Sequence, residues 1–153
     1  MDKDNHSDSE IAEILRCRNV AVVGISRDQT KPSYYVAKYL WEHGYHIVPV
    51  NPIAQEILGL KCYARLLDIH ENVEIVDVFR PSTEVPKVVE GAIAKKAKVV
   101  WLQEGIYNAE AEATAAQEGI KIVWNRCMMK EHVRLFGKKL GISLGRAWSA
   151  VAF

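Results

Sequence analysis

The sequence lacks the marks of a secreted, membrane-spanning or metal-stapled protein. No run of about 18 consecutive apolar residues occurs, and the opening segment MDKDNHSDSE is polar and acidic, unlike the basic start and apolar run of a signal peptide. The three cysteines, Cys17, Cys62 and Cys127, form neither a CxxC motif nor a Cys/His ligand spacing. We therefore expect a cytoplasmic protein with reduced thiols, without a disulfide framework or a metal site.

An excess of charge of either sign is missing as well. The chain has 20 Lys and Arg against 19 Asp and Glu, a net charge of +1, which provides no long-range attraction for nucleic acid or for an anionic membrane. We expect neither as a partner, and any bound anion must be held by local geometry. With 153 residues, 49% of them hydrophobic and 25% charged, the chain is long enough for one domain that buries most of its apolar surface.

Apolar runs of strand length alternate with longer amphipathic segments, which is the pattern of an α/β protein. Strands are predicted at VAVVGI (20–25), YHIVPV (45–50), VEIVDVF (73–79), KVVWL (98–102) and IKIVW (120–124), with a short extended piece at 60–63. Continuous apolar runs are typical of strands that are covered on both faces of a parallel sheet. The pattern predicts a Rossmann-like, doubly wound, mainly parallel sheet of five or six strands flanked by helices.

Helices are predicted around these strands. The first, within residues 7–16, begins with Ser7 and Glu10 at the spacing of a capping box. The second runs from Ser33, its expected N-cap, to about His43, with Gly44 just beyond its end. Three more are expected within residues 82–97, 108–119 and 129–136. Residues 1–137 are expected to form the domain, and 138–153 a C-terminal tail to which no function is assigned.

Ligands of such sheets bind at the carboxyl ends of the strands, so the loops that follow the strands are the candidate site. The first loop, GISRDQTKPSY, carries Gly24, Ser26, Arg27, Lys31 and Ser33 at the amino end of a helix. The free N–H groups and the dipole of a helix at that end favour an anion such as phosphate. A dinucleotide fingerprint is incomplete here, because its second and third glycines are missing.

The second strand also departs from the dinucleotide pattern. No acidic residue ends it to bind a ribose diol, and Asn51 and Pro52 stand there instead. A neutral, rigid Asn-Pro corner can line an adenine or ribose pocket without repelling a nearby phosphate. It therefore suits a nucleotide that carries a phosphate on its ribose.

Five segments together resemble a known family. The segments VAVVGIS, KPSYYVAKYLWEHGYHIVPVNP, EILGLKCYARLLDI, VDVFRPSTEVP and VVWLQEGIYN look like the small stand-alone CoA-binding proteins. Their fold is similar to the CoA-binding domain of the succinyl-CoA synthetase α-subunit and of ADP-forming acyl-CoA synthetases. The resemblance covers roughly residues 10–137 and implies that the chain binds coenzyme A or an acyl-CoA.

The resemblance also implies where the parts of coenzyme A lie. The first loop follows the phosphates, the PVNP corner flanks the adenosine, and the VFRPSTEV segment forms a wall against adenine and the pantetheine arm, with the Arg80 guanidinium over the base. Gln103 reaches a pantetheine amide, which needs a hydrogen-bond partner when buried. Tyr34 is added because it lies in the first helical turn, beside the loop. The candidate binding residues are Gly24, Ile25, Ser26, Arg27, Lys31, Ser33, Tyr34, Val50, Asn51, Pro52, Phe79, Arg80, Pro81, Val85 and Gln103.

One departure from the family and one mutational expectation follow. The synthetases often have a lysine after the Asn-Pro or Thr-Pro corner, where this chain has residues 53–55, IAQ, so phosphate contacts fall to Arg27, Lys31 or backbone amides. Arg80→Ala and Gly24→Val are expected to weaken CoA binding while leaving the fold intact. The glycine change is expected to be the more severe, because a side chain there fills the space for close approach.

Catalytic residues are less apparent. Cys127 ends the last strand and His132 follows five residues later, so a Cys/His pair is conceivable, as is a thiolate near Arg126 that forms a mixed disulfide with the CoA thiol. The favoured alternative is a semi-buried thiol and a surface histidine. Complete ligase activity is not expected of this chain alone. The synthetases transfer a phosphoryl group through a histidine in a second domain and a nucleotide-grasping module, which do not fit in this length.

Three functions remain open at this point. The preferred one is a module that binds CoA or an acyl-CoA and buffers it or presents it to an unidentified protein partner. The second is the CoA-binding subunit of a split acyl-CoA synthetase. The third is an NAD(P)-binding oxidoreductase or sensor, which the absent Gly-x-Gly pattern and the absent acidic residue oppose.

Overall fold

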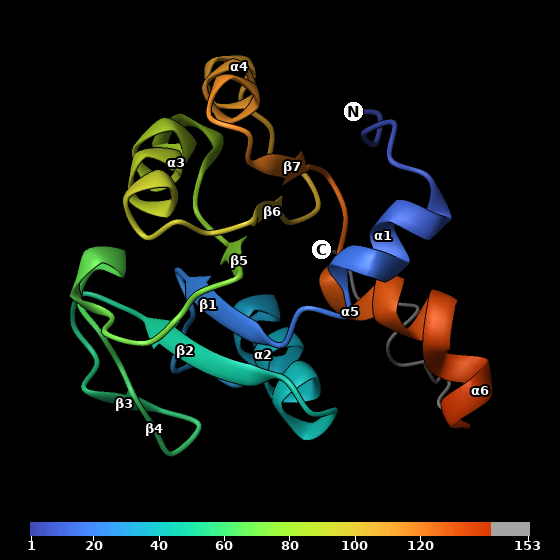
Figure 1. Ribbon diagram of the computed structural model, residues 1–153. Helices are drawn as coiled ribbons and strands as arrows, with labels where there is room; N and C mark the ends of the chain where they lie inside the picture. Colours follow the sequence, from blue (N-terminus) through green and yellow to red (C-terminus); the bar gives the residue numbers. More distant parts are fainter. Residues whose placement is uncertain (142–153) are drawn as a thin grey trace.

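A five-stranded parallel sheet forms the centre of the computed structural model, which describes residues 1–141; residues 142–153, within the expected tail, lie outside the described residues. The strand order is β2-β1-β5-β6-β7 (Figure 1). The pairing is parallel throughout, as in Val20 opposite Ile75 and Val76 opposite Val100. The predicted Rossmann-like α/β fold is confirmed. The strands are β1 (Asn19–Val23), β2 (His46–Val50), β5 (Ile75–Val78), β6 (Val99–Leu102) and β7 (Lys121–Val123).

Helices cover both faces of this sheet. Figure 1 shows α3 (Val85–Ala94) and α4 (Ala109–Gln117) on one face, and α1 (Asp8–Ile14), α2 (Pro32–Glu42) and α5 (Met128–His132) on the other. Short 3-10 turns, η1 (Leu66–Asp68) and η2 (Ser82–Glu84), lie in the connections before and after β5. Helical backbone continues from α5 through the π-helical segment η3 (Val133–Gly137) into α6 (Lys138–Leu140), so it crosses the expected domain boundary at residue 137.

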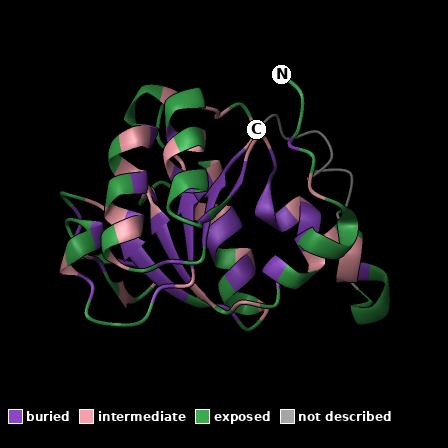
Figure 2. Ribbon diagram, turned by 45° about the horizontal axis from the view of Figure 1, so that its top comes forward, coloured by how far each residue is buried: buried purple, intermediate pink, exposed green. Residues whose placement is uncertain are grey.

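Alternate residues of each strand enter two separate cores. Val20, Val22 and Trp101 pack with α1, α2 and α5, whereas Val76 and Val100 pack with α3 and α4. Side chains of a strand point alternately to its two faces, so a strand that is apolar at every position is buried on both. Figure 2 shows the result, with buried strands enclosed between helices whose outer faces are exposed.

The return from β2 to β5 contains a small hairpin. β3 (Glu56–Ile57) and β4 (Leu60–Lys61) pair antiparallel, and Leu58 and Gly59 turn between them with positive φ at both positions, as tight hairpins require. Beyond β4, Tyr63 forms an isolated parallel bridge with Val50 of β2. The predicted extended piece near residues 60–63 therefore exists, but it does not become a sixth strand of the main sheet.

The observed ends of the helices agree with some of the predicted capping residues and differ from others. The capping box of Ser7 and Glu10 is confirmed, and Gly44 follows α2 with φ +90°. Ser33 is not the N-cap of α2: Lys31 occupies that position, and the helix begins at Pro32, whose missing N–H and fixed φ suit a first helical turn. In the part of the chain that the structure describes, no helix has the length and apolar character needed to cross a bilayer.

Candidate functional site

The loops after β1 and β5 meet where the strand order reverses. β1 is followed by α2 on one face of the sheet and β5 by α3 on the other, so the two connections leave the sheet in opposite directions. In doubly wound sheets, ligands bind in the crevice at such a switch point. The structure therefore places the candidate site between the loop after Val23 and the loop after Val78.

Gly24 brings these two loops into direct contact. Its φ of +86° lies in the left-handed region that favours glycine, and its N–H donates to the Val50 carbonyl at 3.2 Å. A Cβ at this position would lie 2.7 Å from the Phe79 carbonyl oxygen and 2.6 Å from Cδ of Arg80. The structure thus contradicts the expectation that Gly24→Val leaves the fold intact, because a side chain here strains the backbone and displaces the loop after β5.

The loop after β1 is held together by its own side chains. The Ser26 N–H donates to Oγ of the buried Ser33 at 2.9 Å, and Oγ of Ser26 accepts from the Asp28 N–H at 3.0 Å. The Asp28 carboxylate accepts from the Thr30 hydroxyl at 2.7 Å and from its N–H at 2.9 Å, and the hydroxyl bond is the main cause that lowers the pKa of Asp28. These three N–H groups therefore already have partners inside the loop, which Ser33 shapes from the first turn of α2.

The cations of this loop remain available to a ligand. Arg27 and Lys31 are exposed, and neither forms an ion pair with any of residues 1–141. Both flank the amino end of α2, where N–H groups and the helix dipole attract anions. The ionised Asp28 lies between them in sequence, an opposing charge that the sequence analysis did not weigh.

Asn51 joins the loop after β2 to the loop after β1. Its amide nitrogen donates to the Ile25 carbonyl at 2.9 Å, and its amide oxygen accepts from the N–H groups of Ile53 and Ala54 at 2.8 Å each. The polar atoms of this side chain are therefore used inside the protein. Asn51 fixes the shape of the corner, and the exposed Pro52 lies beside it.

Arg80 extends along the crevice and is held by an acidic neighbour. Its Nε and a terminal nitrogen donate to the two carboxylate oxygens of Glu84 at 2.6 and 2.9 Å. The hydrogen bonds with Arg80 lower the pKa of Glu84. Nearly half of each side chain is exposed, 45% for Arg80 and 46% for Glu84, so solvent screens the pair and a phosphate can compete for the guanidinium.

A pocket of about 340 Å³ opens beside Arg80, a volume within the range of small-molecule sites. Four of the predicted binding residues line it, together with Pro32 at the start of α2 and two residues of the loop after β6. The lining residues are Pro32, Phe79, Arg80, Pro81, Gln103, Glu104 and Ile106.

The structure places the other predicted binding residues in three different surroundings. Ile25, Val50 and Val85 are buried in the two cores, so their side chains support the loops from below. Tyr34 is half-buried and packs against the core on the α2 face. Ser33 lies in the first turn of α2, and the remaining candidates belong to the loops after β1 and β2: Gly24, Ser26, Arg27, Lys31, Asn51 and Pro52.

Asp77 is a polar residue of this region that the sequence analysis missed. It lies inside the apolar strand β5 and is fully buried, and the Gln103 amide nitrogen donates to its Oδ1 at 2.5 Å. Burial raises the pKa of Asp77 to about 7, although hydrogen bonds from Gln103 and from the Val78 backbone lower it. A carboxylate in the middle of the apolar run IVDVF of the predicted strand was the signal that could have found it.

Cys127 and His132 do not form a reactive pair. Burial raises the pKa of the Cys127 thiol to about 12, the opposite of an activated thiolate. His132 is buried rather than on the surface, Nδ1 of its ring lies 2.8 Å from the Tyr39 hydroxyl, and burial lowers its pKa to about 4. Among residues 1–141, no group of three or more His, Cys, Asp and Glu side chains converges as for a metal ion.

A larger hollow, of about 570 Å³, lies at the opposite, amino edge of the sheet. Its walls include Lys96, Lys98 and Lys121, but Lys98 already pairs with Glu74 at 3.4 Å. No buried, unpaired side-chain atom of the described residues belongs to its lining, in contrast to the pocket beside Arg80, which Gln103 lines. We therefore favour the smaller pocket, since ligands of parallel sheets bind at the carboxyl edge.

Comparisons with known proteins identify the family of the chain. The profile of a family described as CoA binding domain matches residues 18–133, a stretch that contains β1, β5, β6 and the loops after them. The Bacillus subtilis protein YneT is 38% identical over 129 residues, which cover 84% of this chain and 96% of YneT. An ADP-forming acetate–CoA ligase from Methanocaldococcus jannaschii is 30% identical over 154 residues, 90% of this chain but only 22% of the ligase.

A solved structure extends the likeness to the fold. A protein from Pyrococcus horikoshii OT3 is 46% identical and superposes with a TM-score of 0.85, over 90% of this chain and 100% of that protein. With most of its length matched by one family profile and by relatives of similar length, this chain belongs to the CoA-binding domain family.

Proposed function

We propose that this protein binds coenzyme A or an acyl-CoA across the loops after β1, β2 and β5, with the thiol arm directed to the pocket beside Arg80. The observation that carries this proposal is the family match over residues 18–133, which includes both loops of the switch point. The crevice, its two free cations and a pocket at the carboxyl edge support it.

In this arrangement, each part of coenzyme A lies beside side chains that can bind it. The phosphates face Arg27 and Lys31, which have no competing ion pair among the described residues. The adenine lies against the Arg80 guanidinium, which can stack on it while keeping one carboxylate partner. The pantetheine arm follows Phe79 toward Gln103, whose amide can pair with one of the two amides of the arm.

The remaining predicted residues act by shaping these loops. Ser33 and Asn51 use their side-chain atoms to fix the backbone of the loops after β1 and β2. Ile25, Val50 and Val85 anchor the same loops in the cores. A preorganised loop binds more tightly, because less conformational freedom is lost on binding.

We propose a binding module rather than a complete ligase. The chain spans 22% of the Methanocaldococcus ligase, and the described residues contain no activated nucleophile at the site. A split ligase would require a second chain, so size-exclusion chromatography and affinity purification from the native host distinguish the two functions. A stable heteromeric complex would favour the split enzyme, and a free chain that retains CoA would favour the module.

Isothermal titration of the ligand-free protein tests the proposal. CoA, dephospho-CoA, NAD and NADP are compared in the same buffer and at the same salt concentration. We expect CoA to bind and dephospho-CoA to bind about tenfold more weakly, since one charge-assisted phosphate contact is lost. Nicotinamide cofactors are expected not to bind. Binding of NADP alone, or of none of the four, would contradict CoA binding.

A further inference from the structure

Two buried oxygen atoms at the base of the pocket have no partner. They are Oδ2 of Asp77 and Oε1 of Gln103, and both belong to residues that are already joined by the bond from the Gln103 amide nitrogen to Oδ1 of Asp77. Asp77 is 0% exposed and Gln103 3% exposed. Buried polar atoms are nearly always hydrogen-bonded, so two unpaired acceptor oxygens on neighbouring side chains need an explanation.

A proton on Asp77 would provide a hydrogen-bond partner for both oxygen atoms. A carboxylic acid and a primary amide are complementary: the amide N–H donates to one carboxyl oxygen, while the acid O–H donates to the amide oxygen. With Asp77 neutral, its Oδ2–H can donate to Oε1 of Gln103, and both atoms are satisfied. With Asp77 ionised, Oδ2 and Oε1 stay unpaired, and only N–H groups of Gln103 and Val78 offset the buried charge, which is unfavourable.

No neighbouring cation favours the ionised form. Asp77 forms no ion pair with any of residues 1–141. The charges of Asp77 and of Glu104, beyond the end of β6, both act on the thiol of Cys127, the N-cap residue of α5. Glu104 is itself paired with Lys130 at 3.1 Å, and burial raises the pKa of Cys127 and of Tyr35 from α2, so that thiol and phenol stay neutral. Burial of Asp77 raises its pKa to about 7 in these surroundings.

The Asp77–Gln103 pair lies at the pocket, where the protonation of Asp77 can affect a bound ligand. Gln103 directly follows β6, lines the pocket with Phe79 and Arg80, and donates its backbone N–H to the Val78 carbonyl at 3.3 Å. Asp77 lies on the adjacent strand β5, two residues before Phe79, which follows the end of that strand. The orientation of the Gln103 amide is therefore set by Asp77 from below.

We propose that Asp77 is a positioning residue that carries a proton in the folded protein and holds the Gln103 amide through two hydrogen bonds. Ionisation of Asp77 loosens the pocket and weakens binding of the CoA thiol arm. The part that concerns the ligand rests on the proposed function. The acid–amide pair itself is inferred from the Gln103–Asp77 bond and the two buried oxygens without a partner, independently of any ligand.

The variant Asp77→Asn tests the pair with almost no change of shape. Asparagine supplies a permanent N–H in place of the acid O–H, so it keeps both hydrogen bonds at every pH. An ionisable Asp77 with a raised pKa stabilises the fold below about pH 4, and this contribution is lost as pH rises toward about 7. We therefore expect the melting temperature of the wild type to fall relative to Asp77→Asn between these values and the difference to stay constant above them.

Binding provides the second readout. Isothermal titration with CoA is repeated from about pH 5.5 to 8.5 for the wild type, for Asp77→Asn and for the control Asp68→Asn. Asp68 is a partly exposed carboxylate of η1 that pairs with Arg65. If only the protonated form is competent, wild-type affinity equals that of Asp77→Asn at low pH and is about tenfold weaker near pH 8. Asp68→Asn should follow the wild type, and titration of CoA itself cancels in the comparison.

The outcomes separate the two proposals. A melting difference between wild type and Asp77→Asn that is independent of pH would overturn the neutral pair. An affinity ratio that is independent of pH, with the expected melting curves, would overturn the positioning role. If neither protein binds CoA at any pH, the proposed function fails together with the ligand coupling, while the melting curves still decide whether the acid–amide pair exists.

Discussion

At the scale of single residues, Arg80 shows how the site is arranged without a ligand. Its aliphatic stem lies over Gly24, and its guanidinium is held by Glu84 one helical turn later in the chain. The pair is half exposed and screened by water, so it positions the guanidinium without contributing much to folding. A ligand phosphate or base can therefore replace water around Arg80 at little expense to the fold.

Arg80→Ala is expected to weaken CoA binding about tenfold, because one charge-assisted or stacking contact is lost. Glu84→Gln keeps the guanidinium and removes the carboxylate that competes for it, so it should bind CoA as tightly as the wild type or more tightly. Titration calorimetry measures both, and melting curves confirm that both fold. Equal affinity of Arg80→Ala and wild type would remove Arg80 from the site.

Single residues also show how much of the candidate site could be predicted from the sequence. The loops at the carboxyl edge were chosen because ligands of parallel sheets bind there, and four of the predicted residues line the pocket beside Arg80. The uses of Ser33 and Asn51 could not be predicted. Ser33 bonds to the Ser26 backbone seven residues earlier, and Asn51 bonds to the Ile25 carbonyl of another loop. Both bonds depend on how the folded backbone curves, which residue type alone does not give.

At the scale of elements, the amino-terminal segment is part of the domain rather than a loose leader. Asp4 is buried beside Arg126, with the two side chains only 1% and 7% exposed and an N–O distance of 2.8 Å. The Asp4 carboxylate also accepts from the Trp124 N–H at 2.9 Å, and a ring nitrogen of His6 lies 2.9 Å from the Ile122 carbonyl. These bonds fasten residues before α1 to β7 and to the start of α5.

Asp4→Ala is expected to lower the free energy of unfolding by about 3 kcal/mol, because it leaves the buried Arg126 without its main partner. Asp8→Ala is the matched control: Asp8 pairs with Arg134 at 2.9 Å, but two thirds of its side chain is exposed, so only a small change is expected. Chemical denaturation measures both. Equal stability of the two variants would mean that the amino-terminal segment does not hold β7.

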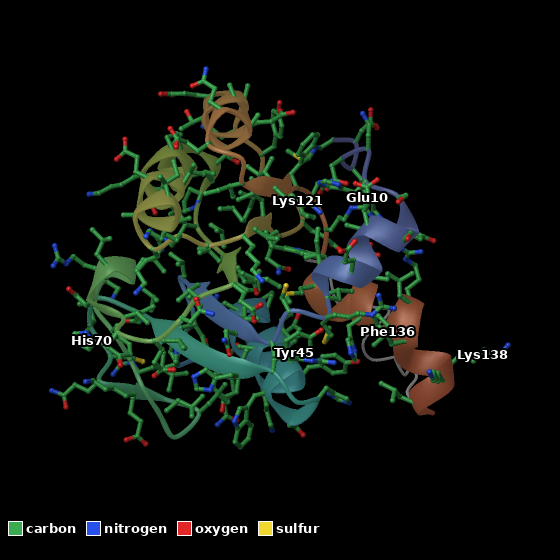
Figure 3. All side chains as sticks on the ribbon, in the orientation of Figure 1. Glu10, Tyr45, His70, Lys121, Phe136 and Lys138 are labelled. Carbon is green, nitrogen blue, oxygen red and sulfur yellow. The ribbon has the colours of Figure 1, made fainter. Side chains whose placement is uncertain are left out.

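Elements were easier to predict than their ends. Each main strand was found from its apolar run, and the predicted helices follow the periodicity of one buried face. Ends depend on local geometry that competing residues can supply, so Pro32 displaced Ser33 from the expected cap. The last helix also runs past Gly137, through η3 into α6, and Lys138 extends away from the body of the domain (Figure 3).

At the scale of the whole molecule, the sheet separates two cores that serve different purposes. The buried hydrophobic residues beneath α3 and α4 are all Ala, Val, Leu or Ile. The core beneath α1, α2 and α5 contains Cys62 and Cys127, and β5 adds Asp77, whose carboxyl lies close to the Cys127 thiol. Polar chemistry is thus concentrated on the face of α2, the helix that also starts at the first loop of the candidate site.

This arrangement predicts the behaviour of the thiols toward oxidised CoA. In thiol–disulfide exchange, a protein thiolate attacks one sulfur of CoA disulfide and a CoA thiolate leaves. Cys127 is buried and its pKa is raised to about 12, so it cannot react without opening the core under α5. The half-buried Cys17 is expected to react first in the folded protein.

Intact-mass spectrometry after incubation with CoA disulfide checks this order. We expect Cys127→Ala to form the same adducts as the wild type under native conditions, and Cys127 to be modified at least about 10³-fold more slowly in the folded protein than in denaturant. Fast native modification of Cys127 would mean that α5 opens independently of the rest of the domain. Because Cys127 lies close to Asp77, such opening would also admit water to the acid–amide pair, so slow labelling is a condition that the proposed protonation of Asp77 must meet.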